Sequence, residues 1–241
     1  MINVGYPANK VGQIQVVDGL LTNDVVTRFL NRAQVHWSES FMGNTLGGFN
    51  PAVKLSHDLH YGPNTGLVWT EEDDAIEKEI CNALTSAIAI YRQTYHHLNN
   101  WVGITDSGFQ VQRYQKNQGF YRVHMDSFPK PNSSVSDRVL AAIIYFNDVE
   151  HGGETNFPLH EVKVAPRAGR ICLFPAVFTH PHESCVPITS DKWIISTFIL
   201  NDEGAEPEQH HADHDHTHET PPLIMGPMPE PFDYDEIIAA I

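Results

Sequence analysis

Residues 138–146 constrain the fold more than any other part of this 241-residue chain. They read Arg-Val-Leu-Ala-Ala-Ile-Ile-Tyr-Phe and end at the turn residues Asn147 and Asp148. A short run with apolar residues at consecutive positions is typical of a strand that is covered on both of its faces. The rest of the chain must therefore supply one layer on each side of this strand.

Strand patterns dominate the chain from residue 108 onward. Polar and apolar residues alternate over residues 109–114 and again in the residues leading to His124. Further short strand patterns, separated by Gly and Pro turns, follow at residues 152–157, 161–164, 170–174 and 192–199. Many short strands preceded by helices predict a mainly β, α+β fold. We expect a double-stranded β-helix (jelly roll) core over residues 105–200, buttressed by N-terminal helices within residues 20–100.

Two helix patterns precede these strands. Thr22 or Asn23 can cap the first, which runs to about Arg32 with a buried stripe of Val25, Val26, Phe29 and Leu30. The second begins at Thr70-Glu-Glu-Asp73, a capping-box-like start whose acids suit a helix N-terminus. Its apolar residues recur at three- and four-residue steps, at Ile76, Ile80, Leu84, Ile88, Tyr91, Tyr95 and Leu98. We expect this stripe to pack on the back of a sheet.

Other N-terminal regions give weaker signals. Residues 1–21 read as short strands followed by the turn pair Asp18-Gly19. Residues 37–68 predict no defined element; they form either a lid or substrate wall, or irregular packing over the core. The group Tyr95, His96 and His97 is interpreted as packing at a helix end.

His124 and Asp126 are separated by one residue within a strand pattern. Residues i and i+2 of a strand point the same way, so this pair presents a nitrogen and a carboxylate oxygen to one centre. A third candidate ligand lies far downstream, at His180 or His182. Two histidines and one carboxylate form the facial set that suits non-haem Fe(II), with the opposite positions left open. The pattern therefore predicts an iron site.

These residues belong to a longer ordered block. It reads Tyr114…Tyr121-x-x-His124-x-Asp126…Tyr145-Phe-Asn-Asp148…Gly152-Gly-Glu-Thr155-Asn-Phe-Pro158…Pro166-x-x-Gly169-Arg170…Phe174…His182…Lys192-Trp193. The block closely resembles the catalytic domain of the prolyl 4-hydroxylases, which are Fe(II)- and 2-oxoglutarate-dependent dioxygenases. The resemblance is strong over residues 108–200 and extends to the N-terminal helices only in general layout.

The resemblance implies roles for individual residues. His124, Asp126 and His182 match the three iron ligands. His182 is preferred to His180 because it lies ten residues before Lys192, the separation that the family keeps before its 2-oxoglutarate anchor. Lys192 would bind the distal carboxylate of 2-oxoglutarate, and an anion would explain a lysine in an apolar strand. A lysine that extends to solvent is the alternative.

Further roles are also implied by the resemblance. Tyr114 matches a tyrosine that hydrogen-bonds 2-oxoglutarate in relatives, and Thr155 and Tyr121 are additional pocket candidates. Arg170 stays open between a structural and a catalytic role. The implied reaction uses O2, converts 2-oxoglutarate to succinate and CO2, and has ascorbate as reductant. A carboxylate at Asp126 favours hydroxylation, because related halogenases have a small residue there.

The resemblance favours proline in a peptide or protein as the substrate. Substrate choice depends mainly on loops, and residues 37–68 and 127–137 do not indicate a particular groove. We expect residues 127–137 to form a mobile loop that orders over a bound peptide. Two alternatives remain: a 2-oxoglutarate oxygenase acting on a small molecule or another amino-acid side chain, and a catalytically silent jelly-roll binding protein.

Charge separates the chain into two parts. The net charge is −15, and residues 202–241 hold eleven Asp and Glu but no Lys or Arg. The other residues carry 19 acids and 15 bases, so their net charge is only −4. This balance gives no support for a nucleic-acid partner. We expect a dioxygenase domain at residues 1–202 and an acidic tail at residues 203–241, whose histidines at 210–218 are dense enough to bind metal weakly.

The three cysteines are too few and too unpatterned for a disulfide framework. The sequence has no apolar run near the roughly 20 residues of a membrane span, and no basic-then-apolar signal peptide at its start. We therefore expect a soluble intracellular protein, by default cytoplasmic, with no membrane partner. The oligomeric state is left open.

Overall fold

The computed structural model describes residues 9–45, 47–100, 104–129, 135 and 137–201. The predicted acidic tail, with its histidine-rich stretch, lies outside the described residues, as does most of the predicted loop at residues 127–137. The expectations for these two segments therefore stay predictions.

A large antiparallel sheet carries most of the described strands. Its strands run in the order β1-β2-β12-β9-β14-β7-β5-β3, and β6 pairs with the far end of β14. The strand bounds are β1 Asn9–Val11, β2 Ile14–Val17, β3 Phe41–Met42, β5 His57–Tyr61, β6 Ile104–Asp106, β7 Phe109–Tyr114, β9 Arg138–Tyr145, β12 Ile171–Pro175 and β14 Lys192–Asn201.

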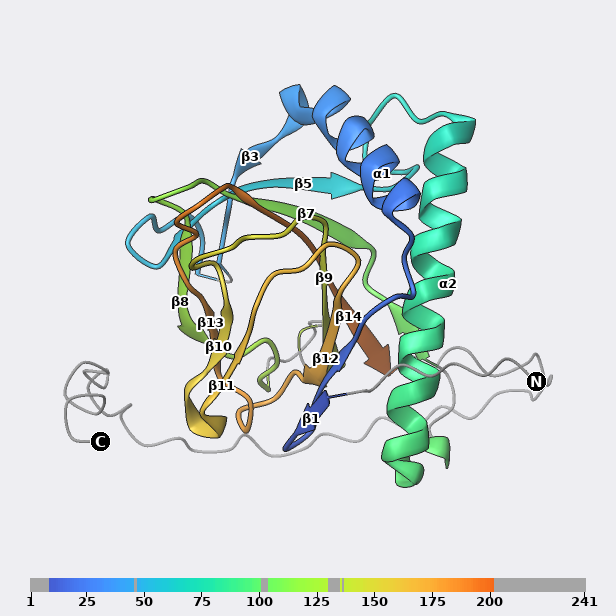
Figure 1. Cartoon of the computed structure of the whole chain (residues 1–241), viewed down its shortest axis with the longest axis vertical. Coiled ribbons are helices and arrows are strands. Elements are labelled where there is room, and N and C mark those ends of the chain that lie inside the picture. Colours follow the sequence, from blue (N-terminus) through green and yellow to red (C-terminus); the bar gives the residue numbers. More distant parts are fainter. Residues whose placement is uncertain (1–8, 46, 101–103, 130–134, 136, 202–241) are drawn as a thin grey trace, which may run out of the picture. The chain divides into compact units, whose positions relative to one another are not determined.

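A smaller antiparallel sheet lies opposite (Figure 1). Its order is β11-β10-β13-β8-β4. The bounds are β4 Lys54–Leu55, β8 Phe120–His124, β10 Thr155–Phe157, β11 Val162–Val164 and β13 His182–Ser184. The expected mainly β fold with a jelly-roll core is confirmed.

The surroundings of strand β9 explain why the residues that follow Arg138 are apolar at consecutive positions. Leu140, Ala142 and Ile144 point into the core beneath the helices. Ala141 and Ile143 point the other way, into the core between the two sheets. Because successive strand residues face opposite sides, both faces of β9 are buried.

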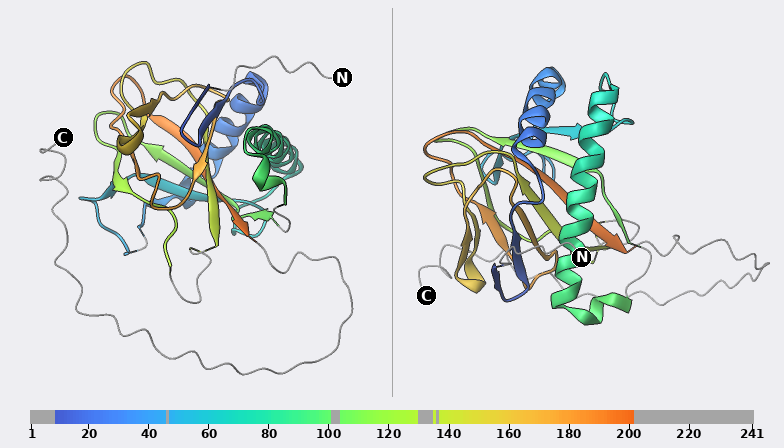
Figure 2. Two further views of the ribbon diagram at one scale, coloured as in Figure 1. Left: turned by 90° about the horizontal axis from the view of Figure 1, so that it is seen from below. Right: turned by 45° about the vertical axis from the view of Figure 1, so that its right-hand side comes forward.

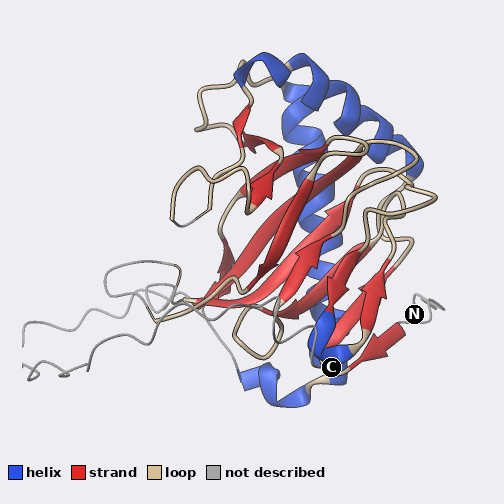
Figure 3. Cartoon of the chain, turned by 90° about the vertical axis from the view of Figure 1, so that its left-hand side faces the viewer, coloured by secondary structure: helices blue, strands red, loops and turns tan. Residues whose placement is uncertain are grey.

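Two long helices cover the outer face of the large sheet (Figures 2 and 3). They are α1, Asn23–Val35, and α2, Glu71–Thr94. Their buried residues pack on outward-facing residues of β9, β12 and β14, such as Ile144, Leu173 and Ile195. Short 3-10 turns add η1 Trp37–Glu39, η2 His96–Asn100 and η3 Pro158–His160. Among the described residues, no helix combines the length and apolar character that crossing a membrane requires.

Some details differ from the sequence patterns. Helix α1 continues to Val35, and its buried stripe includes Ala33, whereas Leu30 is only half-buried. Residues 37–68, for which the pattern predicts no element, contain η1, β3, β4 and β5. Strand β5 was not recognisable because its buried Asp58 looks like a surface residue in sequence.

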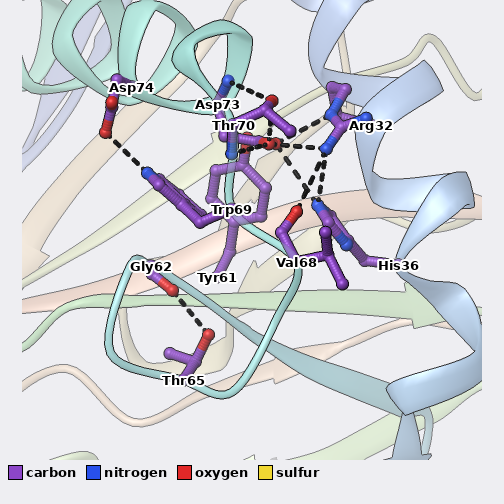
Figure 4. A network of polar contacts seen from close by, with 10 residues as sticks. All are labelled: Arg32, His36, Tyr61, Gly62, Thr65, Val68, Trp69, Thr70, Asp73 and Asp74. Atoms are coloured by element: carbon purple, nitrogen blue, oxygen red, sulfur yellow. Dashed lines mark hydrogen bonds and ion pairs between the residues drawn. The ribbon is translucent and has the colours of Figure 1, made fainter.

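Asp73 links three elements at the start of α2 (Figure 4). Its carboxylate accepts from the Thr70 backbone N–H at 3.0 Å and so completes the predicted capping box. Arg32 of α1 donates to both carboxylate oxygens, at 2.9 and 2.6 Å, and the Tyr61 hydroxyl of β5 donates at 3.0 Å. His36 adds a contact at 3.3 Å. These bonds outweigh burial, which alone would raise the Asp73 pKa, and hold that pKa below its ordinary value.

Replacing Asp73 with alanine is expected to lower the free energy of unfolding by about 3 kcal/mol, because it leaves the Arg32 cation without its buried partner and removes a helix cap. Urea unfolding measures this change. Glu71→Ala, an exposed acid in the same helical turn, is the control and should cost well under about 1 kcal/mol.

The same carboxylate predicts a pH dependence. Its folded pKa lies below the ordinary value of 3.8, so its stabilisation is complete above that pH and is lost as the pH falls further. The difference in free energy of unfolding between the wild type and Asp73→Asn should therefore shrink as the pH is lowered. An advantage that is unchanged down to the acid unfolding transition would contradict the assignment.

Candidate active site

The three predicted metal ligands lie together at one end of the small sheet. His124 ends β8, Asp126 follows two residues later, and His182 begins β13. Strands β8 and β13 lie side by side (Figure 1). They are antiparallel, and their register places His182 opposite His124. The Nε2 atoms of both histidines lie 3.5 Å from the Asp126 carboxylate oxygens, one from each oxygen. One ligand atom from each residue falls within 4.8 Å of the others.

The histidine tautomers suit a metal. Nδ1 of His124 lies 2.8 Å from the backbone oxygen of Arg122, and Nδ1 of His182 lies 3.2 Å from that of His180. A backbone oxygen only accepts, so each Nδ1 carries a proton, and each Nε2 is the ring nitrogen that is available to a metal beside Asp126. Burial lowers the pKa of His182 to about 4, so this imidazole is neutral at pH 7. Two histidine nitrogens and one carboxylate are a ligand set that fits Fe(II).

His180, the rival third ligand, lies elsewhere. Its ring stacks on His160 at 4.3 Å between centroids, and its Nδ1 contacts the Thr179 hydroxyl at 2.8 Å. It is buried but outside the cluster of candidate ligands. Only its backbone oxygen reaches the site, through the bond to His182.

Lys192, the predicted anchor, is the first residue of β14 and is fully buried. Its Nζ donates to the Gly153 backbone oxygen at 3.0 Å and to the Ser184 hydroxyl, and lies 4.4 Å from the Tyr114 ring centroid. Among the ion pairs of the described residues, none includes Lys192. Burial without an acidic partner lowers its pKa to about 7. An anionic ligand would supply the missing counter-charge.

The Gly152-Gly153 pair makes this contact possible. Both residues have positive φ, at 74° and 73°. A Cβ on Gly152 would lie 2.3 Å from the Val186 backbone oxygen. Glycine therefore lets the loop approach closely enough for Gly153 to offer its carbonyl to Lys192.

The remaining predicted residues surround the same cavity. The Tyr114 hydroxyl donates to Oε1 of Gln112 at 2.7 Å. Thr155 lies 2.6 Å, hydroxyl to hydroxyl, from Tyr145. The Tyr121 ring stacks on His124 with centroids 3.6 Å apart and an interplanar angle of 15°. The cavity that these residues and the candidate ligands line measures about 210 Å³.

Several lining residues have no counterpart in the sequence predictions. Gln112, Ser184, Ser196 and Arg138 all face the cavity. The first two lie two positions from Tyr114 and His182, so strand alternation alone would have placed them on the same face. Arg138 donates to the backbone oxygen of Asp126 at 3.0 Å, and its buried Nε has no partner.

Arg170, left open by its sequence, makes structural contacts. Its guanidinium binds both carboxylate oxygens of Asp18 at 2.8 Å and the Ala165 backbone oxygen at 3.0 Å. It does not line the cavity. Its contacts instead join the N-terminal hairpin to β12.

Comparisons with known proteins agree with the sequence resemblance. Residues 109–200 match the family model of the 2OG-Fe(II) oxygenase superfamily. The chain is 30% identical over 122 residues to probable prolyl 4-hydroxylase 9 of Arabidopsis thaliana, and 30% identical over 115 residues to prolyl 4-hydroxylase 13 of the same plant. These matches cover 41% and 38% of this chain, and the chain spans 42% of the length of each relative.

Solved structures share the fold at lower identity. A viral collagen prolyl hydroxylase from Paramecium bursaria Chlorella virus-1 aligns with a TM-score of 0.59 and 16% identity, over 80% of this chain and 97% of that one. A Trichoplax adhaerens prolyl hydroxylase was solved with a peptide fragment of the hypoxia inducible factor oxygen degradation domain. It aligns with a TM-score of 0.61 and 18% identity, over 78% of this chain and 84% of that one.

Proposed function

We propose that the protein hydroxylates proline in a peptide or protein. The proposal starts from residues 109–200, which match the 2OG-Fe(II) oxygenase superfamily and resemble prolyl 4-hydroxylases. The reaction consumes O2 and 2-oxoglutarate and releases succinate and CO2. Ascorbate is the proposed reductant that keeps the iron as Fe(II).

One observation carries this proposal: a buried lysine without an acidic partner shares a cavity with a two-histidine, one-carboxylate cluster. Burying an ammonium group without a counter-charge is costly. A dianion that binds a metal at one end and Lys192 at the other would remove this cost. The cavity thus fits a small dicarboxylate beside a metal.

Each residue has a defined part in this proposal. His124, Asp126 and His182 would hold the iron, which with 2-oxoglutarate bound supplies the oxidising power for hydroxylation. Tyr121 covers one face of the His124 imidazole and limits its rotation. Lys192 would hold the distal carboxylate, and Ser184 and Gly153 orient its ammonium group.

The substrate would enter beside Arg138 and Phe198. Phe198 lies six residues beyond Lys192 on β14 and faces the same cavity, so it stands away from the anchor end. The Arg138 guanidinium lies 3.7 Å from the Phe198 ring centroid and next to Asp126. A cation with an unpartnered N–H on an aromatic ring suits a peptide carbonyl beside a pyrrolidine ring. The printed prolyl 4-hydroxylase names of the relatives support proline as the target.

A coupled assay tests the function. The protein is incubated with Fe(II), ascorbate, 2-oxoglutarate and a library of proline-containing peptides, and succinate and peptide mass are measured together. We expect succinate to form in step with the gain of one oxygen atom on a proline. Succinate without a modified peptide would keep the oxygenase and reject the proline substrate. No succinate from iron-loaded protein would reject the whole proposal.

A further inference from the structure

A chain of three hydrogen-bonding side chains crosses the floor of the cavity. The Tyr114 hydroxyl donates to Gln112 Oε1 at 2.7 Å, and Gln112 Nε2 donates to the Ser196 hydroxyl at 3.1 Å. All three residues line the cavity. Tyr114 and Gln112 are 1% and 6% exposed and their bond is buried, whereas Ser196 is half-buried.

The sheet register shows in which direction this series of hydrogen-bonded side chains runs. On the paired strands β7 and β14, Tyr114 lies opposite Lys192 and Gln112 lies opposite Ile194. Ser196 lies two positions further along β14. Gln112 therefore connects the tyrosine beside the proposed 2-oxoglutarate anchor to a hydroxyl that lies further from it.

Both partners of Gln112 are hydroxyls, and a hydroxyl either donates or accepts. The amide is therefore satisfied in two orientations. In the observed one, Tyr114 gives its proton to Gln112. With the amide turned over, Ser196 donates to Oε1, Nε2 donates to the Tyr114 oxygen, and the Tyr114 proton is free for an acceptor in the cavity.

We propose that Gln112 is a positioning residue: binding of 2-oxoglutarate turns its amide over, so that Tyr114 donates its proton to the co-substrate. This inference rests on the proposed function. It assigns to Gln112 and Ser196 a control over co-substrate affinity without direct contact.

Two substitutions separate this role from a merely structural one. A glutamate carboxylate only accepts hydrogen bonds, so Gln112→Glu keeps the Tyr114 proton occupied. Leucine accepts none, so Gln112→Leu releases that proton from residue 112, while the Ser184 side chain, which also hydrogen-bonds Tyr114, is the same in both variants. We expect Gln112→Glu to bind 2-oxoglutarate about 30-fold more weakly than the wild type, and Gln112→Leu to stay within about threefold of it. A structural role predicts the opposite order, because glutamate preserves shape and hydrogen bonds better.

The readout is calorimetric titration of 2-oxoglutarate into Mn(II)-loaded protein, which needs no turnover. Mn(II) affinity and thermal unfolding of each variant check the fold. Repeating the pair in a Tyr114→Phe background controls for charge repulsion. There the two variants should agree within about threefold, because no tyrosine proton remains to be occupied. A defect of Gln112→Glu that persists in that background would overturn the inference.

Ser196→Ala provides an independent test should Gln112→Glu not fold. The turned-over amide needs the Ser196 proton, so this variant should bind 2-oxoglutarate about fivefold more weakly. Unchanged affinity would overturn the inference. A wild type that binds no 2-oxoglutarate would overturn the proposed function as well, whereas tight wild-type binding with the reversed variant order would reject only the role of Gln112.

Discussion

Replacing His182 with alanine is expected to abolish iron binding and turnover, whereas His180→Ala should keep both. His182 supplies an Nε2 directed at Asp126, and its loss leaves two candidate ligands. His180 contributes only a backbone oxygen, which alanine also has. Metal content after dialysis and succinate formation are the two measurements.

His180→Ala serves as the matched control, since both histidines are buried and lie two residues apart. It should lose stability through its lost packing on His160, by about 1–2 kcal/mol. Iron retained by His182→Ala but lost from His180→Ala would overturn the choice of ligand. Loss from both variants would point to damage to the β13 segment and would be checked by their unfolding curves.

Replacing Lys192 with alanine is expected to weaken 2-oxoglutarate binding by about 100-fold or more, because the distal carboxylate loses a buried counter-charge. Metal affinity should not change, since Lys192 lies outside the ligand cluster. Titration of 2-oxoglutarate into Mn(II)-loaded protein measures the loss. Lys163→Ala, at an exposed position of β11, is the control and should bind normally. Metal lost with co-substrate affinity intact would mean that Lys192 is misassigned.

The same lysine should make binding depend on pH. In the ligand-free protein its pKa is lowered from the ordinary 10.5 to about 7, chiefly by burial. A bound dianion favours the charged form, so binding at pH 8 should take up a proton, and affinity should fall as the pH rises above about 7. The same pKa difference predicts how the stability of the ligand-free protein depends on pH. The unfolded lysine holds its proton up to its ordinary pKa of 10.5, whereas the folded one loses it near 7, so the free energy of unfolding rises between pH 7 and 10.5. Calorimetry in buffers of different ionisation enthalpy measures the proton uptake, which Lys192→Ala should abolish.

The fold could be predicted where local pattern and tertiary environment agree. The apolar residues of β9 required a layer on each face, and the helices and the small sheet supply these layers. The Thr70–Asp73 capping box formed as its spacing indicated. Strand β5 was missed because Asp58 is buried through bonds to Lys54, Ser56 and Gln110, partners that no local pattern identifies.

Part of the candidate site could likewise be predicted from the sequence, and part of it could not. His124 and Asp126 form an i, i+2 pair that can be read along the chain, whereas Lys192 was proposed as an anchor only through the family resemblance. The meeting of Lys192 with Tyr114, and of Gln112 with Ser196, depends on the β7–β14 register, which brings together residues 78 and 84 positions apart. The alternation of residues along one strand does not reveal which strand lies beside it.

Both candidate imidazole ligands are oriented by main-chain oxygens, those of Arg122 and His180. No side-chain substitution can delete such an oxygen. Substitutions in the cavity walls can therefore change the space for a ligand while these two candidate ligands keep their hydrogen-bonded Nδ1 atoms. Natural divergence has the same freedom, so side chains around the cavity can change while the orientation of the two candidate imidazole ligands is retained.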